Sequence, residues 1–268
     1  MNPENYWKYT SRPEDLLIPS PIHKVLSSIA KYQVRALLMG GQACILYGAS
    51  ELTRDIDFAI LASPGNLSQL ASALALLEAR VIAVPPFELE YLNRGHAVHF
   101  RCSVPEAAGW RVDIMTRMRG VDSFSDLWHR RTTVTAADGT RCDLMSLPDL
   151  IQAKKTQRDK DWPMIRRLVE ADYFAGLASA TDANIRLWLA QLRTPELLIE
   201  VAAANPQLCR SLEPSRPLLR FAAEGDEAAV SKSLAEEEIA EREADRMYWK
   251  PLKAELEQLR HQHLRDQK

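Results

Sequence analysis

The sequence predicts an α+β protein, in which a mixed β-sheet flanked by helices is followed by a helical C-terminal region. Up to about residue 175, short apolar runs alternate with turns, and most of the Gly, Pro and β-branched residues lie there. Beyond that point Ala, Leu, Glu and Arg dominate, as is typical of helices. We therefore expect an α+β domain over 1–175 and a helical region over 176–268.

The first expected elements are a helix, a strand and a second helix. Residues 21–31 carry apolar side chains at spacings of three and four, which predicts a helix. The run VRALLM over 34–39 ends in Gly40-Gly41, as expected for a buried strand followed by a tight turn. Residues 42–47 are expected to form a short helix that stops at a glycine.

The middle of the chain continues the alternation of strands and helices. The run DIDFAIL over 55–61 predicts a strand, and the Ala/Leu-rich residues 67–78 predict a helix. Residues 97–102 and 110–115 are expected to be two strands joined by a loop. The later elements are strands over 132–136 and 142–145 around the turn dipeptide Asp138-Gly139, and a helix over 147–153.

The two ends of the chain are expected to differ. Residues 1–12 are polar and aromatic and predict an arm, and a helix can open at Pro13. Residues 184–192 and 195–204 are apolar at helical spacing. The charged stretch 224–262 predicts one long helix, or two if Pro251 divides it.

Composition excludes several classes of protein. The chain has 268 residues with 34 Lys+Arg against 36 Asp+Glu, a net charge of -2, so it does not hold nucleic acid by bulk positive charge. It contains no run of about 18 apolar residues. The first residues lack the pattern of a secretory signal, and the four cysteines form no CxxC motif. We expect a cytoplasmic protein with reduced thiols and no membrane span.

Two carboxylates are the clearest candidate site. Asp55 and Asp57 flank Ile56, and side chains alternate faces along a strand, so both acids point to the same side. Paired carboxylates repel each other unless a cation lies between them, and hard oxygen ligands suit Mg²⁺. Taken alone, Asp-x-Asp is more often a solvated strand face.

Three further features favour a site. Gly40-Gly41 ends the preceding strand and lets backbone N–H groups approach phosphates, although it can be only a turn. Asp113 lies within an apolar strand, where a carboxylate is costly unless it binds metal or pairs with Arg111 or Arg101. A cationic cluster on a helix, or a solvated helix face, follows the sheet and comprises Lys154, Lys155, Arg158, Lys160 and Asp161.

With these residues the sequence resembles the nucleotidyltransferase superfamily. LLMGGQACILYGASELTRDIDFAI is similar to its opening signature, a Gly-Gly or Gly-Ser turn followed by a DxD strand. SLPDLIQAKKTQRDKDW resembles the helix that follows in small bacterial members, including the AbiEii-like toxins. The resemblance covers roughly 22–170. It implies a nucleotidyltransferase-like catalytic domain that transfers a nucleoside monophosphate from a nucleoside triphosphate such as ATP to an acceptor.

The resemblance implies a role for each candidate residue. Asp55 and Asp57 would bind two Mg²⁺ ions, and Asp113 would bind one of them and help to activate the acceptor hydroxyl. Gly40 and Gly41 would hold the triphosphate. The other residues assigned to nucleotide binding are Gln42, where many members have Ser; Arg54, which can compensate for Glu51 where small members often carry Arg; Lys154, with Lys155 as the alternative; and Arg158, Lys160 and Asp161 on the phosphate or acceptor side.

Several alternatives remain open at this stage. The acceptor can be RNA, tRNA included, a protein side chain or a small molecule, and Arg130-Arg131 and Arg166-Arg167 are candidate RNA contacts. The toxin-like resemblance implies an antitoxin partner. The rival hypotheses are a non-catalytic binding module that kept the nucleotidyltransferase fold, and a structural protein without a nucleotide site.

Overall fold

The computed structural model describes residues 20–49, 53–136 and 138–266. The expected N-terminal arm, the helix opening at Pro13 and Glu51 lie outside these residues. By packing, the chain forms two compact units. We call residues 20–45, 53–153 and 248–266 the sheet unit, and residues 46–49 and 154–247 the helical unit. The expected boundary at residue 175 stays a prediction.

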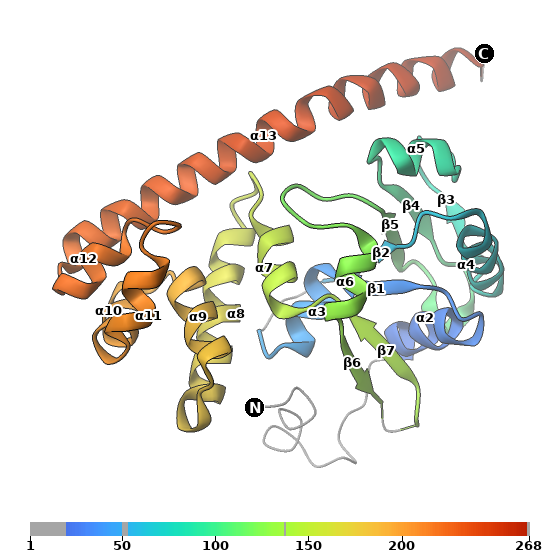
Figure 1. The fold of residues 1–268 in the computed structure, drawn as a ribbon. Helices are drawn as coiled ribbons and strands as arrows, with labels where there is room; N and C mark the ends of the chain where they lie inside the picture. The colour runs from blue at the N-terminus through green and yellow to red at the C-terminus, as the bar shows by residue number, and fades with distance from the viewer. Residues whose placement is uncertain (1–19, 50–52, 137, 267–268) are drawn as a thin grey trace. The chain divides into compact units, whose positions relative to one another are not determined.

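Within the described residues, seven strands form one mixed sheet, as the α+β prediction requires (Figure 1). The pairs β1–β7 and β2–β5 are parallel, and the other neighbours are antiparallel. Six strands fall within a residue or two of their predicted places, whereas β3 has only two residues, too few to show an alternating pattern. In sheet order the strands are β3 (Arg80–Val81), β4 (Val98–Arg101), β5 (Arg111–Met115), β2 (Asp55–Ile60), β1 (Ala36–Met39), β7 (Arg141–Leu144) and β6 (Thr132–Thr135).

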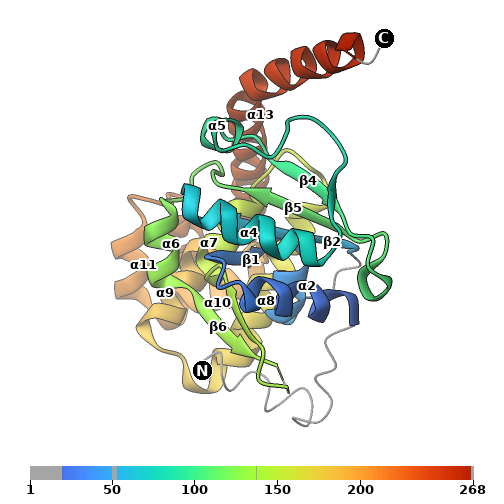
Figure 2. The ribbon, with the colours of Figure 1, turned by 90° about the vertical axis from the view of Figure 1, so that its right-hand side faces the viewer.

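Helices flank this sheet within the sheet unit. Helices α2 and α4 lie side by side over one face (Figure 2). The core is apolar, and Phe58, Ile56 and Ile114 are almost completely buried in it. The sequence did not predict α5 and α6, because six or seven residues are too few for helical periodicity to show. The helices are α2 (Ser20–Lys31), α3 (Gly40–Leu46), α4 (Pro64–Leu76), α5 (Leu89–Arg94), α6 (Phe124–Arg130) and α7 (Leu147–Lys154).

The helical unit packs around Trp188, Leu189 and Leu219, all nearly inaccessible to solvent. Its last helix, α13, is continuous through Pro251, which settles the question that the sequence left open. The final part of α13, from residue 248, belongs to the sheet unit, where Glu255 pairs with Arg94 and His96. The helices are α8 (Asp161–Gly176), α9 (Asp182–Gln191), α10 (Pro195–Ala204), α11 (Pro206–Leu212), α12 (Leu219–Glu224) and α13 (Glu227–Asp266).

The predicted cationic cluster does not lie on one helix, which corrects the sequence-based expectation. Lys154 ends α7, Asp161 begins α8, and the residues between them form a loop. The loop is held by its own polar groups, because the Arg158 amide donates to Thr156 Oγ1 and the Asp161 amide donates to the Arg158 carbonyl. Among the described helices, none is long and apolar enough to cross a bilayer.

Candidate functional site

Three acidic residues, which we call the carboxylate cluster, meet on one face of the sheet: Asp55, Asp57 and Asp113. Strands β2 and β5 run parallel, and their register pairs Asp57 with Asp113. Asp55 lies two residues before Asp57 on β2, so strand alternation puts it on the same face. The sequence-predicted juxtaposition of the three acids is therefore present, and their roles as metal ligands remain a proposal.

A guanidinium group lies among these carboxylates. Arg111 Nη2 is 3.2 Å from Asp55 Oδ2 and 2.6 Å from Asp113 Oδ2. Arg111 Nε donates a second hydrogen bond, of 3.1 Å, to Asp113 Oδ2. Partial burial lowers the pKa of Arg111, but the bond to Asp113 and the negative charges of the cluster outweigh it, so this pKa lies above its ordinary value.

Asp113 is the most enclosed acid of the cluster, with 4% of its surface exposed. Besides Arg111, it contacts His99 on the antiparallel neighbour β4, whose Nδ1 lies 2.9 Å from Asp113 Oδ1. Both oxygens of Asp113 are thus engaged by side chains. The buried carboxylate is satisfied without any bound group, as a buried charge must be.

The glycine turn after β1 touches the cluster directly. Gly40 has φ +66°, and a Cβ atom there would lie 1.9 Å from Asp57 Oδ2. Only glycine fits such a close approach in a left-handed conformation. Gly41 and Gln42 are buried in α3, and Gln42 Nε2 donates to the Thr53 carbonyl at 3.3 Å, which anchors the approach to β2. Arg54 is exposed.

The remaining candidates lie in the helical unit, around a fully buried carboxylate. Asp161 accepts hydrogen bonds from Lys154 Nζ at 3.3 Å, Thr156 Oγ1 at 2.6 Å and Arg158 Nε at 2.7 Å. We call these four residues the Asp161 cluster. Burial raises the pKa of Asp161, but the charge of Lys154 and the bonds from Thr156 and Arg158 outweigh it and hold this pKa below its usual range.

The two alternative lysines differ in their surroundings. Lys154 is 5% exposed and bonded within the Asp161 cluster. Lys155 lies 3.8 Å from Glu241 and lines a cavity of about 620 Å³ within the helical unit. Burial lowers the pKa of Lys155. Lys160 is exposed. The structure describes these residues and the carboxylate cluster in separate units.

The carboxylate cluster can attract a cation. Three carboxylates lie on one face of the sheet, and Arg111 contacts two of them. Oxygen donors of this kind suit Mg²⁺, which binds one or two carboxylates together with water and phosphate oxygens. As they stand, no three acidic, His or Cys side chains among the described residues are arranged around one metal position. Arg111 supplies the positive charge between Asp55 and Asp113.

The sequence suggested Arg111 as a possible pair for Asp113. It argued against a shared metal at His96 and His99, but it did not identify His99 as a partner of Asp113. A signal for both exists in the sequence. Arg111 lies two residues before Asp113 and therefore shares its face in a strand. His99 becomes the cross-strand neighbour of Asp113 once residues 97–102 and 110–115 are paired antiparallel.

Comparisons with known proteins add little to this geometry. No protein-family model matches the sequence, and no curated protein matches it. Among solved structures, the chain is similar to the crystal structure of JHP933 from Helicobacter pylori, with 11% sequence identity and a TM-score of 0.37. The match covers 91% of this chain and 99% of that chain.

Proposed function

We propose that the protein is a Mg²⁺-dependent nucleotidyltransferase that transfers a nucleoside monophosphate from a nucleoside triphosphate to an acceptor. The observation that carries the proposal is the register of β2 and β5, which places Asp57 beside Asp113 with Asp55 on the same face. The closely packed Gly40 turn lies against Asp57. This combination supports the resemblance of the glycine turn and the DxD strand to the nucleotidyltransferase superfamily.

The residues of the cluster would divide the work by their surroundings. Asp55, whose side chain is 42% exposed, and Asp57 would hold Mg²⁺. When bound, two such ions stabilise the attacking and leaving oxygens of an in-line displacement. Asp113 would complete the donor set and orient the acceptor hydroxyl. Arg111 would then turn its guanidinium toward the phosphate oxygens, for which its planar donor geometry is suited.

The proposal covers RNA, a protein side chain or a small molecule as the acceptor. A role as the toxin of a toxin–antitoxin pair is likewise proposed.

One observation favours a second candidate function, a non-catalytic binding module. Asp113 is engaged on both oxygens by Arg111 and His99, so the cluster is already neutralised in part by the protein itself. A module of this kind would keep the fold and bind neither Mg²⁺ nor nucleotide in the cluster.

Calorimetric titration separates the two candidates. The protein is titrated with each nucleoside triphosphate, with and without Mg²⁺, beside the Asp55→Asn/Asp57→Asn variant. The enzyme hypothesis predicts Mg²⁺-dependent binding that this variant loses. The matched control is Glu78→Gln/Glu88→Gln, which removes two exposed carboxylates of the sheet unit and should bind as the unaltered protein does. Equal binding by the Asp55→Asn/Asp57→Asn variant would contradict the metal assignment.

Transfer itself needs a second measurement. A labelled nucleoside triphosphate is incubated with candidate acceptors, first total RNA and then protein, in the presence of Mg²⁺. Label that becomes attached to one acceptor class, and that fails to attach with the Asp55→Asn/Asp57→Asn variant, would support the enzyme and name its acceptor. Mg²⁺-dependent nucleotide binding without transfer to either class would point to a small-molecule acceptor.

A further inference from the structure

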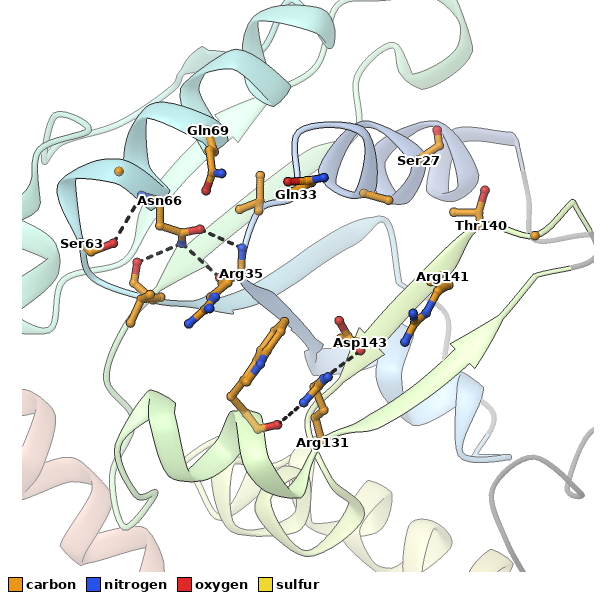
Figure 3. Close-up of a pocket in the computed structure, with 16 residues that line it drawn as sticks. Ser27, Gln33, Arg35, Ser63, Asn66, Gln69, Arg131, Thr140, Arg141 and Asp143 are labelled. Carbon is orange, nitrogen blue, oxygen red and sulfur yellow. Dashed lines mark hydrogen bonds and ion pairs between the residues drawn. The ribbon is translucent and has the colours of Figure 1, made fainter.

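A second cavity, of about 1030 Å³, opens in the sheet unit at the other end of the β1–β2 pair (Figure 3). Its wall includes Arg35, just before β1, and Leu61, just after β2. The pairs Ala36–Ile60 and Met39–Asp57 are three residues apart along β1, about 10 Å at the rise of a strand. The cavity is therefore separate from the carboxylate cluster.

Three arginines line this cavity, and they come from three different elements. Arg35 precedes β1, Arg131 follows α6, and Arg141 begins β7 (Figure 3). Among the described residues of the lining, Asp143 is the acidic one. Asp138, in the turn between β6 and β7, is bonded to Thr140 of the lining, so the three arginines outnumber these two carboxylates. This contrasts with the whole chain, whose net charge is -2. Local positive charge in a concave site concentrates anionic ligands.

Arg131 is held in place by its neighbours. Its Nε donates to Asp143 Oδ1 at 3.0 Å, and its Nη1 donates to the Trp128 carbonyl at 2.6 Å. Its guanidinium lies 4.2 Å from the centre of the Trp128 ring. These two hydrogen bonds use two of the five N–H groups of an arginine. The other N–H groups belong to a guanidinium whose position is already fixed, which lowers the entropy cost of binding an anion.

Arg35 is positioned through its backbone. Asn66, which is 4% exposed, accepts a 2.7 Å hydrogen bond from the Arg35 amide and donates one of 3.1 Å to the Arg35 carbonyl. The same side-chain amide also donates to the Leu61 carbonyl at 2.9 Å. Asn66 thus fixes the chain on both sides of the cavity while the Arg35 side chain stays exposed.

We infer that this cavity binds a small phosphorylated ligand that carries at least two phosphate groups and is about the size of a nucleotide. Arginine is suited to phosphate because its planar donors bind two oxygens at once. The volume is at the upper end of the range for small-molecule sites. Beyond the arginines, the wall offers uncharged hydrogen-bonding side chains for the rest of the ligand: Ser27, Gln33, Ser63, Gln69 and Thr140.

The test uses inorganic pyrophosphate and ATP as probes, in EDTA and in the Asp55→Asn/Asp57→Asn background. These conditions remove the metal-dependent site proposed above, so failure of one proposal is distinguishable from failure of the other. We expect both probes to bind, and we expect Arg35→Ala/Arg141→Ala to weaken binding by about tenfold or more. Both arginines are exposed, so this variant should fold. The single variant Arg141→Ala gives a second, milder comparison.

The matched control is Arg80→Ala, which removes an exposed arginine from β3, on the opposite side of the sheet from β7. Its affinity for both probes should be unchanged. Unchanged affinity in the Arg35→Ala/Arg141→Ala variant would overturn the inference, as would failure of both probes to bind in EDTA. Binding of a short single-stranded RNA through these arginines, without binding of pyrophosphate or ATP, would overturn it in favour of a nucleic-acid surface.

Discussion

The two charged clusters of this protein are built in opposite ways. In the carboxylate cluster one arginine contacts two of the three acids, and the Asp55 side chain is 42% exposed. In the Asp161 cluster one acid is surrounded by a lysine, an arginine and a hydroxyl, and the acid is fully buried. One cluster is rich in carboxylates, and the other has a single carboxylate that is held by three side chains.

This difference predicts different roles for the two clusters. The carboxylate of Asp161 and the ammonium of Lys154 are both buried, so removing either one takes a charge partner from the other, away from water, which is costly. Partly exposed acids in excess over their cations repel one another, and a further cation relieves that repulsion. We therefore expect the Asp161 cluster to contribute to stability, and cation binding by the carboxylate cluster remains our proposal.

The largest expected effect on stability comes from removing the buried carboxylate of the Asp161 cluster. Asp161→Ala removes the charge that the buried Lys154 faces, and we expect a loss of about 3 kcal/mol in the free energy of unfolding. Urea unfolding measures it. The control is Asp159→Asn in the same loop, whose side chain is 97% exposed and pairs with Arg242. It should cost about 1 kcal/mol or less. A loss that small for Asp161→Ala would show that the Asp161 cluster contributes little to stability.

The pH dependence of stability gives the same cluster a second test. The pKa of Asp161 is lower in the folded protein than its ordinary value, so the folded state binds the proton less readily than the unfolded state. The stabilisation is therefore complete above about pH 4, the ordinary range of an aspartate, and is lost as the pH falls through the folded-state pKa. Asp161→Ala should flatten the acid limb of the stability profile relative to Asp159→Asn.

The next effect concerns the glycine turn. Gly40→Ala forces a left-handed residue to carry a Cβ atom 1.9 Å from Asp57 Oδ2, and we expect a loss of about 2 kcal/mol or more. Thermal unfolding measures this loss. Gly65→Ala is the control, because a Cβ atom at Gly65 meets nothing within 4 Å. Equal stability of the two variants would mean that Gly40 does not press on the carboxylate cluster.

A smaller effect is expected from the central arginine. Arg111→Gln removes the cation that Asp55 and Asp113 share, and we expect a loss of about 1 kcal/mol without metal. Added Mg²⁺ should raise the melting temperature of this variant by more than it raises that of the unaltered protein, because the acids then depend on the metal for neutralisation. Arg101→Gln, an exposed arginine of β4, is the control. An equal rise in melting temperature for Arg111→Gln and the unaltered protein would show that Arg111 does not neutralise these acids.

The smallest effect on stability is expected at Lys160, an exposed residue of the loop between α7 and α8. Lys160→Ala should change the free energy of unfolding by no more than about 0.5 kcal/mol, since the side chain is exposed. Urea unfolding beside Asp161→Ala gives the comparison. A large loss would mean that Lys160 stabilises the fold together with the Asp161 cluster.

Local patterns in the sequence were enough to predict the framework of the site. The alternation in DIDFAIL places Asp55 and Asp57 on one face, and the apolar neighbours of Asp113 place it in a strand. Gly40-Gly41 marks the turn that follows β1. These features depend on neighbours in the chain, which a sequence shows directly.

The partners of these residues depend on register and burial, which a sequence does not show. Arg111 reaches Asp55 only because β5 pairs in parallel with β2, from which it is separated by about 50 residues. Asp161 is buried and bonded because the preceding loop folds back onto it. In the sequence, charged residues at helical spacing predict a solvated helix face instead. The arginines of the second cavity come from three separate elements.

We propose that the carboxylate cluster binds divalent cations and that the Asp161 cluster does not. Titration with Mn²⁺ alone, followed by electron paramagnetic resonance, tests this difference. We expect bound Mn²⁺ that is lost in the Asp55→Asn/Asp57→Asn variant and retained in Glu78→Gln/Glu88→Gln. The same amount of bound Mn²⁺ in the Asp55→Asn/Asp57→Asn variant would contradict it.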